Sequence, residues 1–331
     1  MTTIARVAVI GAGGWGTALA LVLAQRGKEV SLWTRRADAA EKLRATRQNP
    51  AYLPGVAIPP SVEIASGAPP KADAYVFAVP TQHIRATLTK TTVGDRPILS
   101  VSKGIEGGTL LRPSEILHEI FGRAHVTVLS GPSHAEEVAR GLPVTLVAAS
   151  KAEARARLWQ KLLSGNSFRV YTSNDPVGVE LGGALKNVVA IAAGICDGLE
   201  LGDNAKAALL SRGIVEMARL GAALGAKKHT FFGISGIGDL ITTCYSPHGR
   251  NLRVGRAIGA GRKLVDVLAD MKQVAEGVWT ARGVRKLAAK HKVDVPISEQ
   301  VDAILHEERP PMEALRALFA RPPRSEEEDL A

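Results

Sequence analysis

The chain has 331 residues, of which 46% are hydrophobic and 22% are charged. These fractions are close to average globular usage and exclude a disordered or collagen-like chain, and at about 100–200 residues per domain the length predicts two domains. Forty-two lysines and arginines against 32 acidic residues give a net charge of +10, which attracts anions in general. Because the basic residues are scattered and lack interleaved aromatics, we expect no nucleic-acid partner.

The chain has two cysteines, Cys196 and Cys244, and neither lies in a CxxC motif or near a histidine at metal-ligand spacing. We therefore expect no disulfide framework and no metal site, which fits a reducing cytoplasm. The N-terminus reaches a predicted strand before any apolar run of signal-peptide length, and no uncharged apolar stretch of ~18 residues follows. The sequence thus predicts neither secretion nor an integral membrane segment.

Short apolar strands alternate with helical segments over the first half of the chain. Such alternation is typical of a doubly wound, mostly parallel sheet, so we assign residues 1–176 to an α/β domain. The opening reads strand, glycine turn, helix, strand, which is a βαβ unit. The predicted strands are residues 7–10, 30–33, 75–79, 98–101, 126–129, 144–148 and 168–171, and the first two helices are residues 17–26 and 37–46.

Beyond the turn at residues 172–176 the apolar period changes to 3.6 residues. This period predicts an all-helical second domain over residues 177–320, which we assign to substrate binding. Residues 321–331 are rich in proline and acidic side chains, so we expect a disordered tail. The predicted helices are residues 177–199, 205–224, 252–260, 264–271, 280–291 and 298–305.

A GxGxxG motif directly follows the first strand and opens the first helix. Gly11 allows the tight turn, Gly13 lets backbone N–H groups approach a pyrophosphate, and Gly16 lets the helix pack close to the sheet. Alone the motif is weak, and glycines that serve only a turn are the simpler alternative. In this context it predicts a Rossmann-type dinucleotide-binding domain.

Two arginines, Arg35 and Arg36, follow the second strand, where a protein selective for NAD usually has an acidic residue. Two guanidiniums in this position suit a 2′-phosphate, so we predict that NADPH binds at least as well as NADH. The alternative is two solvated surface arginines.

Two neighbouring strands end in groups suited to anions. Lys103 follows the strand at residues 98–101, and Gly131 and Ser133 follow the strand at residues 126–129, just before a helix predicted to begin near His134. Ligands of open α/β sheets bind at such carboxyl ends. A solvent-exposed loop lysine is the alternative for Lys103.

Lys186 lies in an apolar helix rich in glycine and alanine, in which Glu180 is the other charged residue before Cys196. Burial lowers the pKa of a lysine and makes it a usable proton donor or acceptor near neutral pH. Gly182, Gly183 and Ala190 on neighbouring turns would leave room for a ligand. The alternative is a lysine that snorkels to solvent from the helix.

Asp239 and the pair Arg250-Asn251 complete a set that suits a small phosphorylated polyol. With Lys103 and Lys186 they supply a carboxylate, a guanidinium, an amide and two ammonium groups. Cys244 and His248 carry no mark of an activated nucleophile and its base, and we interpret both as bystanders. Spacing alone does not show that these side chains converge.

These segments, in this order, resemble the bacterial-type NAD(P)-dependent glycerol-3-phosphate dehydrogenase family. The resemblance runs from about Ile4 to Phe319. It rests on residues 9–20 (VIGAGGWGTALA), 49–55 (NPAYLPG), 102–104 (SKG), 130–133 (SGPS), 180–187 (ELGGALKN), 238–240 (GDL), 250–251 (RN) and 274–277 (VAEG).

The resemblance implies reversible hydride transfer between NAD(P)H and dihydroxyacetone phosphate, giving sn-glycerol 3-phosphate for glycerophospholipid synthesis in a cytoplasmic homodimer. It also implies that Lys186 is the general acid/base, with Lys103 and Asp239 as further catalytic residues. The implied substrate contacts are Lys103, Gly131, Ser133, Lys186, Asn187, Asp239, Thr243, Gly249, Arg250 and Asn251. The implied cofactor contacts are Gly11, Gly13, Gly14, Trp15, Gly16, Arg35, Arg36, Lys103, Ala135, Arg250, Val274 and Glu276.

Three positions depart from the family pattern. Gly14 and Gly249 stand where serine is common, and His134 stands where phenylalanine is common. Each lost hydroxyl removes a contact worth roughly 1 kcal/mol, although backbone N–H groups can serve instead.

Two alternatives stay open. One is a related dehydrogenase acting on a 3-hydroxyacid or a ketopantoate-like substrate, against which the Arg250-Asn251 pair favours phosphate. The other is an NADP-binding sensor without catalysis, which the presence of Lys103, Lys186 and Asp239 disfavours.

Overall fold

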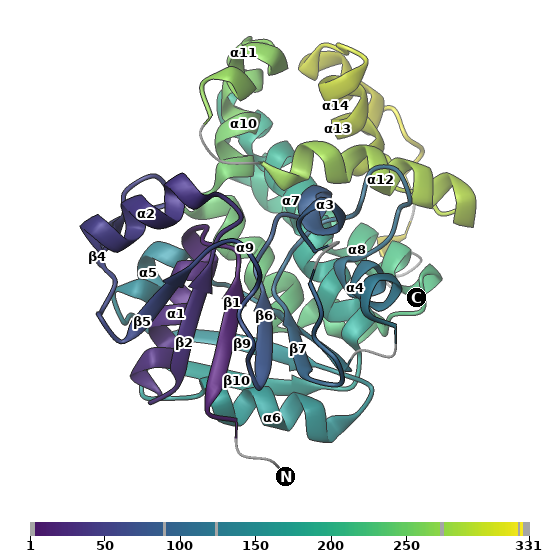
Figure 1. Cartoon of the computed structure of the whole chain (residues 1–331). Helices are drawn as coiled ribbons and strands as arrows, with labels where there is room; N and C mark the ends of the chain where they lie inside the picture. The colour runs from purple at the N-terminus through teal and green to yellow at the C-terminus, as the bar shows by residue number, and fades with distance from the viewer. Residues whose placement is uncertain (1–3, 89–90, 123–124, 272–274, 324, 327–331) are drawn as a thin grey trace. The chain divides into compact units, whose positions relative to one another are not determined.

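The computed structural model describes residues 4–88, 91–122, 125–271, 275–323 and 325–326. The chain divides into two compact units (Figure 1). Unit 1 comprises residues 1–103 and 111–176, and unit 2 comprises residues 104–110 and 177–331. Unit 2 therefore includes Gly104–Leu110, a short segment that interrupts unit 1 in the sequence.

Unit 1 is built around an eight-stranded sheet with the strand order β10-β9-β8-β7-β6-β1-β2-β5 (Figure 1). Every pairing is parallel except that of β8 with β9. The predicted Rossmann-type, mostly parallel sheet is confirmed. The strands are β1 (Arg6–Ile10), β2 (Glu29–Trp33), β5 (Val62–Ala65), β6 (Ala74–Phe77), β7 (Pro97–Ser100), β8 (His125–Ser130), β9 (Val144–Ala149) and β10 (Phe168–Ser173).

Helices and a small hairpin complete unit 1. The helices are α1 (Gly14–Gln25), α2 (Ala37–Thr46), η1 (Thr81–His83), α3 (Ile84–Leu88), α4 (Pro113–Phe121), α5 (Ala135–Ala139) and α6 (Glu153–Leu163). The hairpin, β3 (Gln48–Asn49) with β4 (Leu53–Ala57), lies where the sequence predicts only a proline-rich loop.

The alternation of side chains along β1 builds two cores, one on each face of the sheet. Val7 and Val9 belong to one apolar cluster, and Ala8 and Ile10 belong to the other. Because successive side chains of a strand point to opposite faces, a continuous apolar run indicates a strand covered on both sides. This explains why the buried strands can be predicted from the sequence.

Unit 2 is helical, as predicted. The helices are α7 (Pro176–Gly198), α8 (Gly202–Ala223), η2 (Lys228–Phe232), η3 (Ile234–Gly238), α9 (Asp239–Tyr245), α10 (Arg250–Gly259), α11 (Leu264–Ala269), α12 (Glu276–His291), α13 (Pro296–His306) and α14 (Pro311–Phe319). Four of these are missed by the periodicity: the 3₁₀ turn η2, the π-helical turn η3, the short α9 and the terminal α14. The first three span five to seven residues, which is too short for an apolar period to stand out.

Helix α7 is the centre of unit 2, and its residues from Gly178 to Ile195 are all buried. Its length and mean hydropathy of 1.5 would allow it to span a membrane, but 89% of its most apolar window is buried in the fold. That degree of burial is typical of the core helix of a globular domain.

A buried glutamate ties α8 to the start of α13. The carboxylate of Glu216 accepts hydrogen bonds from the backbone N–H groups of Ile297 (2.8 Å) and Ser298 (2.9 Å) and from the Ser298 hydroxyl (2.6 Å). It thereby caps donors that the helix leaves without intrahelical partners. Burial raises the pKa of Glu216 to about 7, against the opposing effect of these hydrogen bonds.

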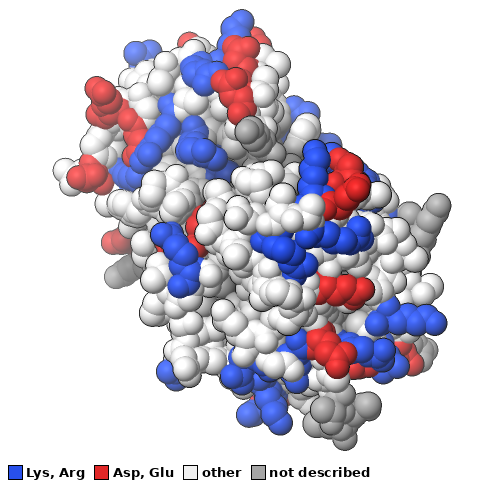
Figure 2. Space-filling view, turned by 60° about the vertical axis from the view of Figure 1, so that its left-hand side comes forward, with Lys and Arg blue, Asp and Glu red and all other residues white. Residues whose placement is uncertain are grey.

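Basic and acidic side chains are interspersed on the surface shown in Figure 2. The basic residues on this face form several separate groups with acidic residues beside them. They do not form the continuous basic stripe that is typical of a nucleic-acid interface.

Candidate active site

The glycine turn after β1 forms a cradle made of backbone. Gly11 has φ = +115°, and a Cβ there would lie 2.5 Å from the Ala78 carbonyl oxygen. At Gly16 a Cβ would lie 1.9 Å from the carbonyl oxygen of Gly11, so this position needs glycine for close packing. A Cβ at Gly13 would meet no atom within 4 Å, so the space beside it is open.

Helix α1 begins at this turn without a side-chain cap. Gly13 is its N-cap, and no acidic residue lies in its first turn. The N–H groups of the first turn and the positive end of the helix dipole therefore suit a pyrophosphate placed beside Gly13. Trp15 and Ala135, two predicted cofactor contacts, pack partly buried against the apolar core of unit 1.

Asn49 holds the glycine turn in place, a role that the sequence does not predict although the residue begins the 49–55 segment of the family resemblance. Its side-chain nitrogen donates to the carbonyl of Ala12 (3.0 Å) and to the hydroxyl of Thr17 (2.9 Å). The side chain is buried, and Asn49 belongs to the hairpin strand β3. The Asn-Pro pair at residues 49–50 is the signal that marks it, since this pair favours a turn.

Two of the departures from the family pattern have a steric reason. A Cβ at Gly14 would lie 2.6 Å from the carbonyl oxygen of Tyr52, and one at Gly249 would lie 2.8 Å from that of Thr243. A serine at either position would force the neighbouring backbone to move. His134 is the partly buried N-cap of the short helix α5.

Both arginines after β2 are exposed. Arg36 turns back onto Asp38, with its Nε 3.1 Å from Oδ1 and a second contact between Nη2 and Oδ2. This hydrogen bond lowers the pKa of Asp38 to about 2 and raises that of Arg36. The two predicted guanidiniums therefore differ, because the carboxylate of Asp38 already binds that of Arg36.

Three predicted residues meet at the carboxyl ends of β7 and β8. The carbonyl of Gly131 accepts hydrogen bonds from the Lys103 ammonium (3.0 Å) and from the Ser133 hydroxyl (2.9 Å). Gly131 has φ = +135°, which favours glycine in this turn. Lys103 is thus fixed at the sheet edge.

In unit 2, three predicted residues converge although they are far apart in the sequence. The ammonium of Lys186 on α7 donates to the Asp239 carboxylate and to the Thr243 hydroxyl (2.6 Å), both on α9. The Thr243 hydroxyl donates in turn to the Asp239 carbonyl (2.7 Å). Lys186 is 6% exposed and Asp239 is 1% exposed, so the pair is a buried one.

The space predicted beside Gly182 is not open to a ligand. A Cβ there would lie 2.6 Å from the carbonyl oxygen of Ser235, which belongs to the π-helical turn before α9. The prediction that this glycine leaves room for a ligand is wrong. Its small size instead lets η3 and α9 approach α7.

A chain of buried amides joins three helices. Asn251 on α10 donates to Asn187 on α7 (2.9 Å) and accepts from the backbone N–H of Gly277 in α12 (3.0 Å), while Asn187 donates to the Gly183 carbonyl (3.2 Å). The side chains of Asn187 and Asn251 therefore use part of their hydrogen-bonding capacity on one another. Arg250, next to Asn251, is exposed at the start of α10.

Glycines bring α7 and α10 into backbone contact. A Cβ at Gly194 would lie 2.2 Å from the Leu252 carbonyl oxygen, and one at Gly255 would lie 2.0 Å from that of Ile191. Gly198 and Gly259 repeat the arrangement one turn further on. This close approach fixes the separation between Lys186-Asn187 and Arg250-Asn251, which lie on the two helices.

An ion cluster holds the far end of the same helix pair. The carboxylate of Asp197 contacts the Lys206 ammonium (2.9 and 3.0 Å) and the Arg256 guanidinium (2.9 Å to Nε). Lys206 is 6% exposed and lies over the ring of Tyr245, with 4.6 Å between Nζ and the ring centroid. The cluster links α7, α8, α9 and α10.

The structure bears differently on the remaining residues considered in the sequence analysis. Burial raises the pKa of Cys244 to about 12, so its thiol stays protonated and is no nucleophile at neutral pH. Glu276 is the first residue of α12, and Val274 lies outside the described residues. Within the part of the chain that the structure describes, no group of three or more His, Cys, Asp or Glu side chains could hold a metal ion.

Two family models match nearly the whole chain. The model of the NAD-dependent glycerol-3-phosphate dehydrogenase N-terminus matches residues 6–156, and that of the C-terminus matches residues 175–316. Glycerol-3-phosphate dehydrogenase [NAD(P)+] 2 of Salinibacter ruber is 47% identical over 324 residues, which cover 95% of this chain and 94% of the relative.

Solved structures show the same likeness. The glycerol-3-phosphate dehydrogenase structure from Coxiella burnetii has a TM-score of 0.89 and 37% identity, covering 96% of this chain and 99% of that one. A ketopantoate reductase structure from Ralstonia eutropha has a TM-score of 0.60 at 17% identity, covering 94% of this chain and 99% of that one. The second likeness concerns the fold alone.

Proposed function

The chain belongs to the NAD-dependent glycerol-3-phosphate dehydrogenase family, and from this premise we propose how its own residues divide the reduction of dihydroxyacetone phosphate by NAD(P)H. When bound, the reduced nicotinamide supplies a hydride to C2 of the ketone. The residues of unit 1 bind and orient the dinucleotide, and the buried polar residues of unit 2 bind the substrate and supply the proton.

The glycine turn of unit 1 holds the pyrophosphate. The open space at Gly13 and the uncapped first turn of α1 support this role, since both leave room and donors for an anion. We assign Gly14, Trp15 and Ala135 to further contacts with the cofactor. Lys103, fixed by the Gly131 carbonyl, is assigned to polarise and orient substrate.

The observation that carries the proposed mechanism is the buried ammonium of Lys186 between Asp239 and Thr243. Lys186 donates a proton to the C2 oxygen as the hydride reaches C2, which leaves a neutral alcohol and an amine. Asp239 and Thr243 orient the ammonium and stabilise its charged form before the transfer. In the reverse direction the amine accepts the same proton.

The start of α10 is assigned to the substrate phosphate. Arg250 is exposed there and is suited to grip a phosphate, while Gly249 supplies backbone at the N-terminus of the helix. Asn187 and Asn251 fix this helix end to α7 and α12 through their mutual hydrogen bond. Their position sets the distance between the phosphate and the C2 oxygen.

Arg35 is proposed to bind the 2′-phosphate, so that NADPH binds at least as well as NADH. It is exposed after β2, whereas Asp38 partly neutralises its neighbour Arg36. We further propose a cytoplasmic homodimer that supplies sn-glycerol 3-phosphate for glycerophospholipid synthesis. The described cysteines are both unpaired, which is typical of a reducing compartment.

The test is oxidation of NADPH and of NADH, followed by absorbance, with dihydroxyacetone phosphate, unphosphorylated dihydroxyacetone and ketopantoate in parallel. Turnover of the phosphorylated ketone alone is expected. Equal turnover of ketopantoate would contradict the proposed phosphate site. Binding of NADPH without turnover of any of the three would contradict the catalytic roles.

A further inference from the structure

Unit 2 contains a cavity that the proposed catalytic roles do not use. It has a volume of about 600 Å³ and is bordered by α7, α8, α13 and α14. This volume lies within the roughly 300–1,000 Å³ that is typical of ligand pockets, and the cavity is open to solvent on one side. Most of its lining is apolar, including Ile195, Leu199, Leu209, Ile304, Leu315 and Leu318.

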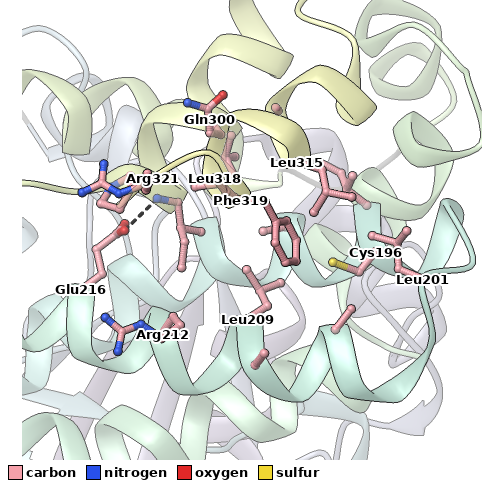
Figure 3. Close-up of a pocket in the computed structure, with 18 of the residues that line it drawn as sticks. Cys196, Leu201, Leu209, Arg212, Glu216, Gln300, Leu315, Leu318, Phe319 and Arg321 are labelled. Atoms are coloured by element: carbon pink, nitrogen blue, oxygen red, sulfur yellow. Dashed lines mark hydrogen bonds between the residues drawn. The ribbon is translucent and has the colours of Figure 1, made fainter. Parts of the chain in front are cut away.

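Part of the polar lining gathers at one end of the cavity. Figure 3 shows Arg212, Glu216 and Arg321 together on one side, and Phe319, Leu315 and Leu201 on the other. Arg219 and Gln300 also line the cavity. The site is therefore asymmetric along its length, with one polar end and one apolar end.

The polar end is built from fixed side chains. Glu216 is 4% exposed, and its carboxylate is held by the start of α13. Arg219 donates to the Asp294 carbonyl (2.8 Å), and Arg321 contacts the Asp294 carboxylate (2.5 Å). The lining holds three guanidiniums, from Arg212, Arg219 and Arg321, against two carboxylates, from Glu216 and Glu326. The basic groups are in excess, and their N–H donors suit an acceptor such as a carboxylate.

The apolar end leaves a large surface uncovered. Phe319, the last residue of α14, is 81% exposed although it lines the cavity. An apolar chain lying between α8 and α14 would cover this ring and remove further apolar surface from water. The gain rises with the apolar area covered, at roughly 25 cal/mol per Å².

We propose that this cavity is a binding site for an amphipathic small molecule with a linear apolar chain and a single carboxylate head. The chain lies along the apolar lining, and the head faces the arginines. This site is separate from the residues assigned to the dinucleotide and to the substrate, so the inference goes beyond the proposed function. No covalent step is involved.

The test is calorimetric titration of the full chain with decanoate, below the concentration at which decanoate aggregates. Ala208 lines the cavity and its neighbour Ala207 does not, and both are exposed on α8. We expect saturable binding of one decanoate per chain, weakened at least about tenfold by Ala208→Trp and unchanged by Ala207→Trp. Thermal unfolding of both variants checks that each is folded.

The head group is tested with arginine variants and with decanol. Arg212 lines the cavity, whereas Arg316 is exposed on α14 outside it. Arg212→Gln is expected to weaken decanoate several-fold and decanol little, and Arg316→Gln is the matched control. Equal weakening of decanol would overturn the assignment of the carboxylate to this end.

Three outcomes would overturn the site itself. They are absence of saturable binding, binding unchanged by Ala208→Trp, and a dimer in sedimentation that Ala208→Trp dissociates while decanoate does not bind. The last would show that a second copy of the chain covers the cavity. Turnover of dihydroxyacetone phosphate, measured on the same samples, reports separately on the proposed function.

Discussion

In unit 1 the residues assigned to the pyrophosphate are glycines and backbone groups after β1, whereas in unit 2 the residues assigned to proton transfer are buried side chains. The proposed role of the turn in unit 1 depends on the space and the backbone N–H donors that it leaves for a pyrophosphate. The cluster of Lys186, Asp239 and Thr243 works by holding an ammonium out of water between fixed acceptors.

The two units should therefore tolerate substitution differently. A backbone cradle fails when a side chain is added, because the ligand or a neighbouring carbonyl needs the space. A buried polar cluster fails when a side chain is removed, because the partner left behind is desolvated without compensation.

Lys186→Ala is expected to lower kcat by about 10²–10⁴-fold, the usual range for a positioned acid or base. The dissociation constant of NADPH should stay near that of the unchanged chain. Lys206→Ala is the matched control, because Lys206 is as buried as Lys186 and also pairs with an aspartate, Asp197. If both variants lose kcat equally, the loss is structural and Lys186 has no special role.

The free energy of unfolding is expected to fall as the pH rises from about 4.5 to about 7, because of Glu216. Its pKa is about 7 in the folded chain against 4.5 as the ordinary value, so the folded state binds more protons in this window. At 1.36 kcal/mol per unit the loss is on the order of 3 kcal/mol. Urea unfolding across this window measures it.

Glu216→Gln removes the titrating group and should remove the slope, at the cost of a constant loss of stability where an amide N–H₂ meets a backbone N–H. An unchanged slope in this variant would contradict the assignment. The matched comparison is Glu313→Gln, an exposed residue in the first turn of α14, which should leave the slope in place.

Gly255→Ala is expected to destabilise unit 2 by about 1–3 kcal/mol, the usual cost of overpacking. It should also raise KM for dihydroxyacetone phosphate, because the added Cβ pushes α10 away from the Ile191 carbonyl on α7. Gly108→Ala is the control, since a Cβ there meets no atom within 4 Å. A lower stability with unchanged KM would show that the contact only stabilises the fold.

Gly13→Ala is expected to weaken NADPH about tenfold, or ~1.4 kcal/mol, while changing the free energy of unfolding by less than about 1 kcal/mol. The reason is that its Cβ would enter the open space of the cradle. Gly16→Ala should instead lower both stability and binding, since its Cβ would meet the Gly11 carbonyl. Fluorescence titration and thermal unfolding separate the two effects.

Arg35→Gln is expected to raise the dissociation constant of NADPH by a few-fold and to leave that of NADH unchanged. Arg36→Gln should have a smaller effect on NADPH, because Asp38 already binds this guanidinium. An equal effect of the two substitutions would show that Asp38 releases Arg36 to the 2′-phosphate.

The sequence predicts the regular elements of the fold better than its tight contacts. The apolar strands and the long helices carry a clear period, as the run from Val7 to Ile10 shows, whereas β5 alternates over four residues only and η3 has no period at all. The hairpin of β3 and β4 depends on strand pairing, and a proline-rich segment gives no pattern that predicts such pairing.

The candidate site shows the same limit. Residue types single out Lys186, Asp239 and Arg250, but the contact between α7 and α9 depends on how the chain packs between them. Gly182 illustrates this, because small size is visible in the sequence while the Ser235 carbonyl that uses it is not. The role of Asn49 is equally hidden in the sequence, because it depends on two acceptors, one in the glycine turn and one in the first helix.

The most direct test of the division between the two units measures Lys186→Ala and Gly13→Ala side by side, each for the dissociation constant of NADPH and for kcat at saturating substrates. We expect opposite results in the two variants: Lys186→Ala loses kcat and keeps NADPH affinity, whereas Gly13→Ala loses affinity and keeps most of kcat. Loss of both quantities in both variants would contradict it.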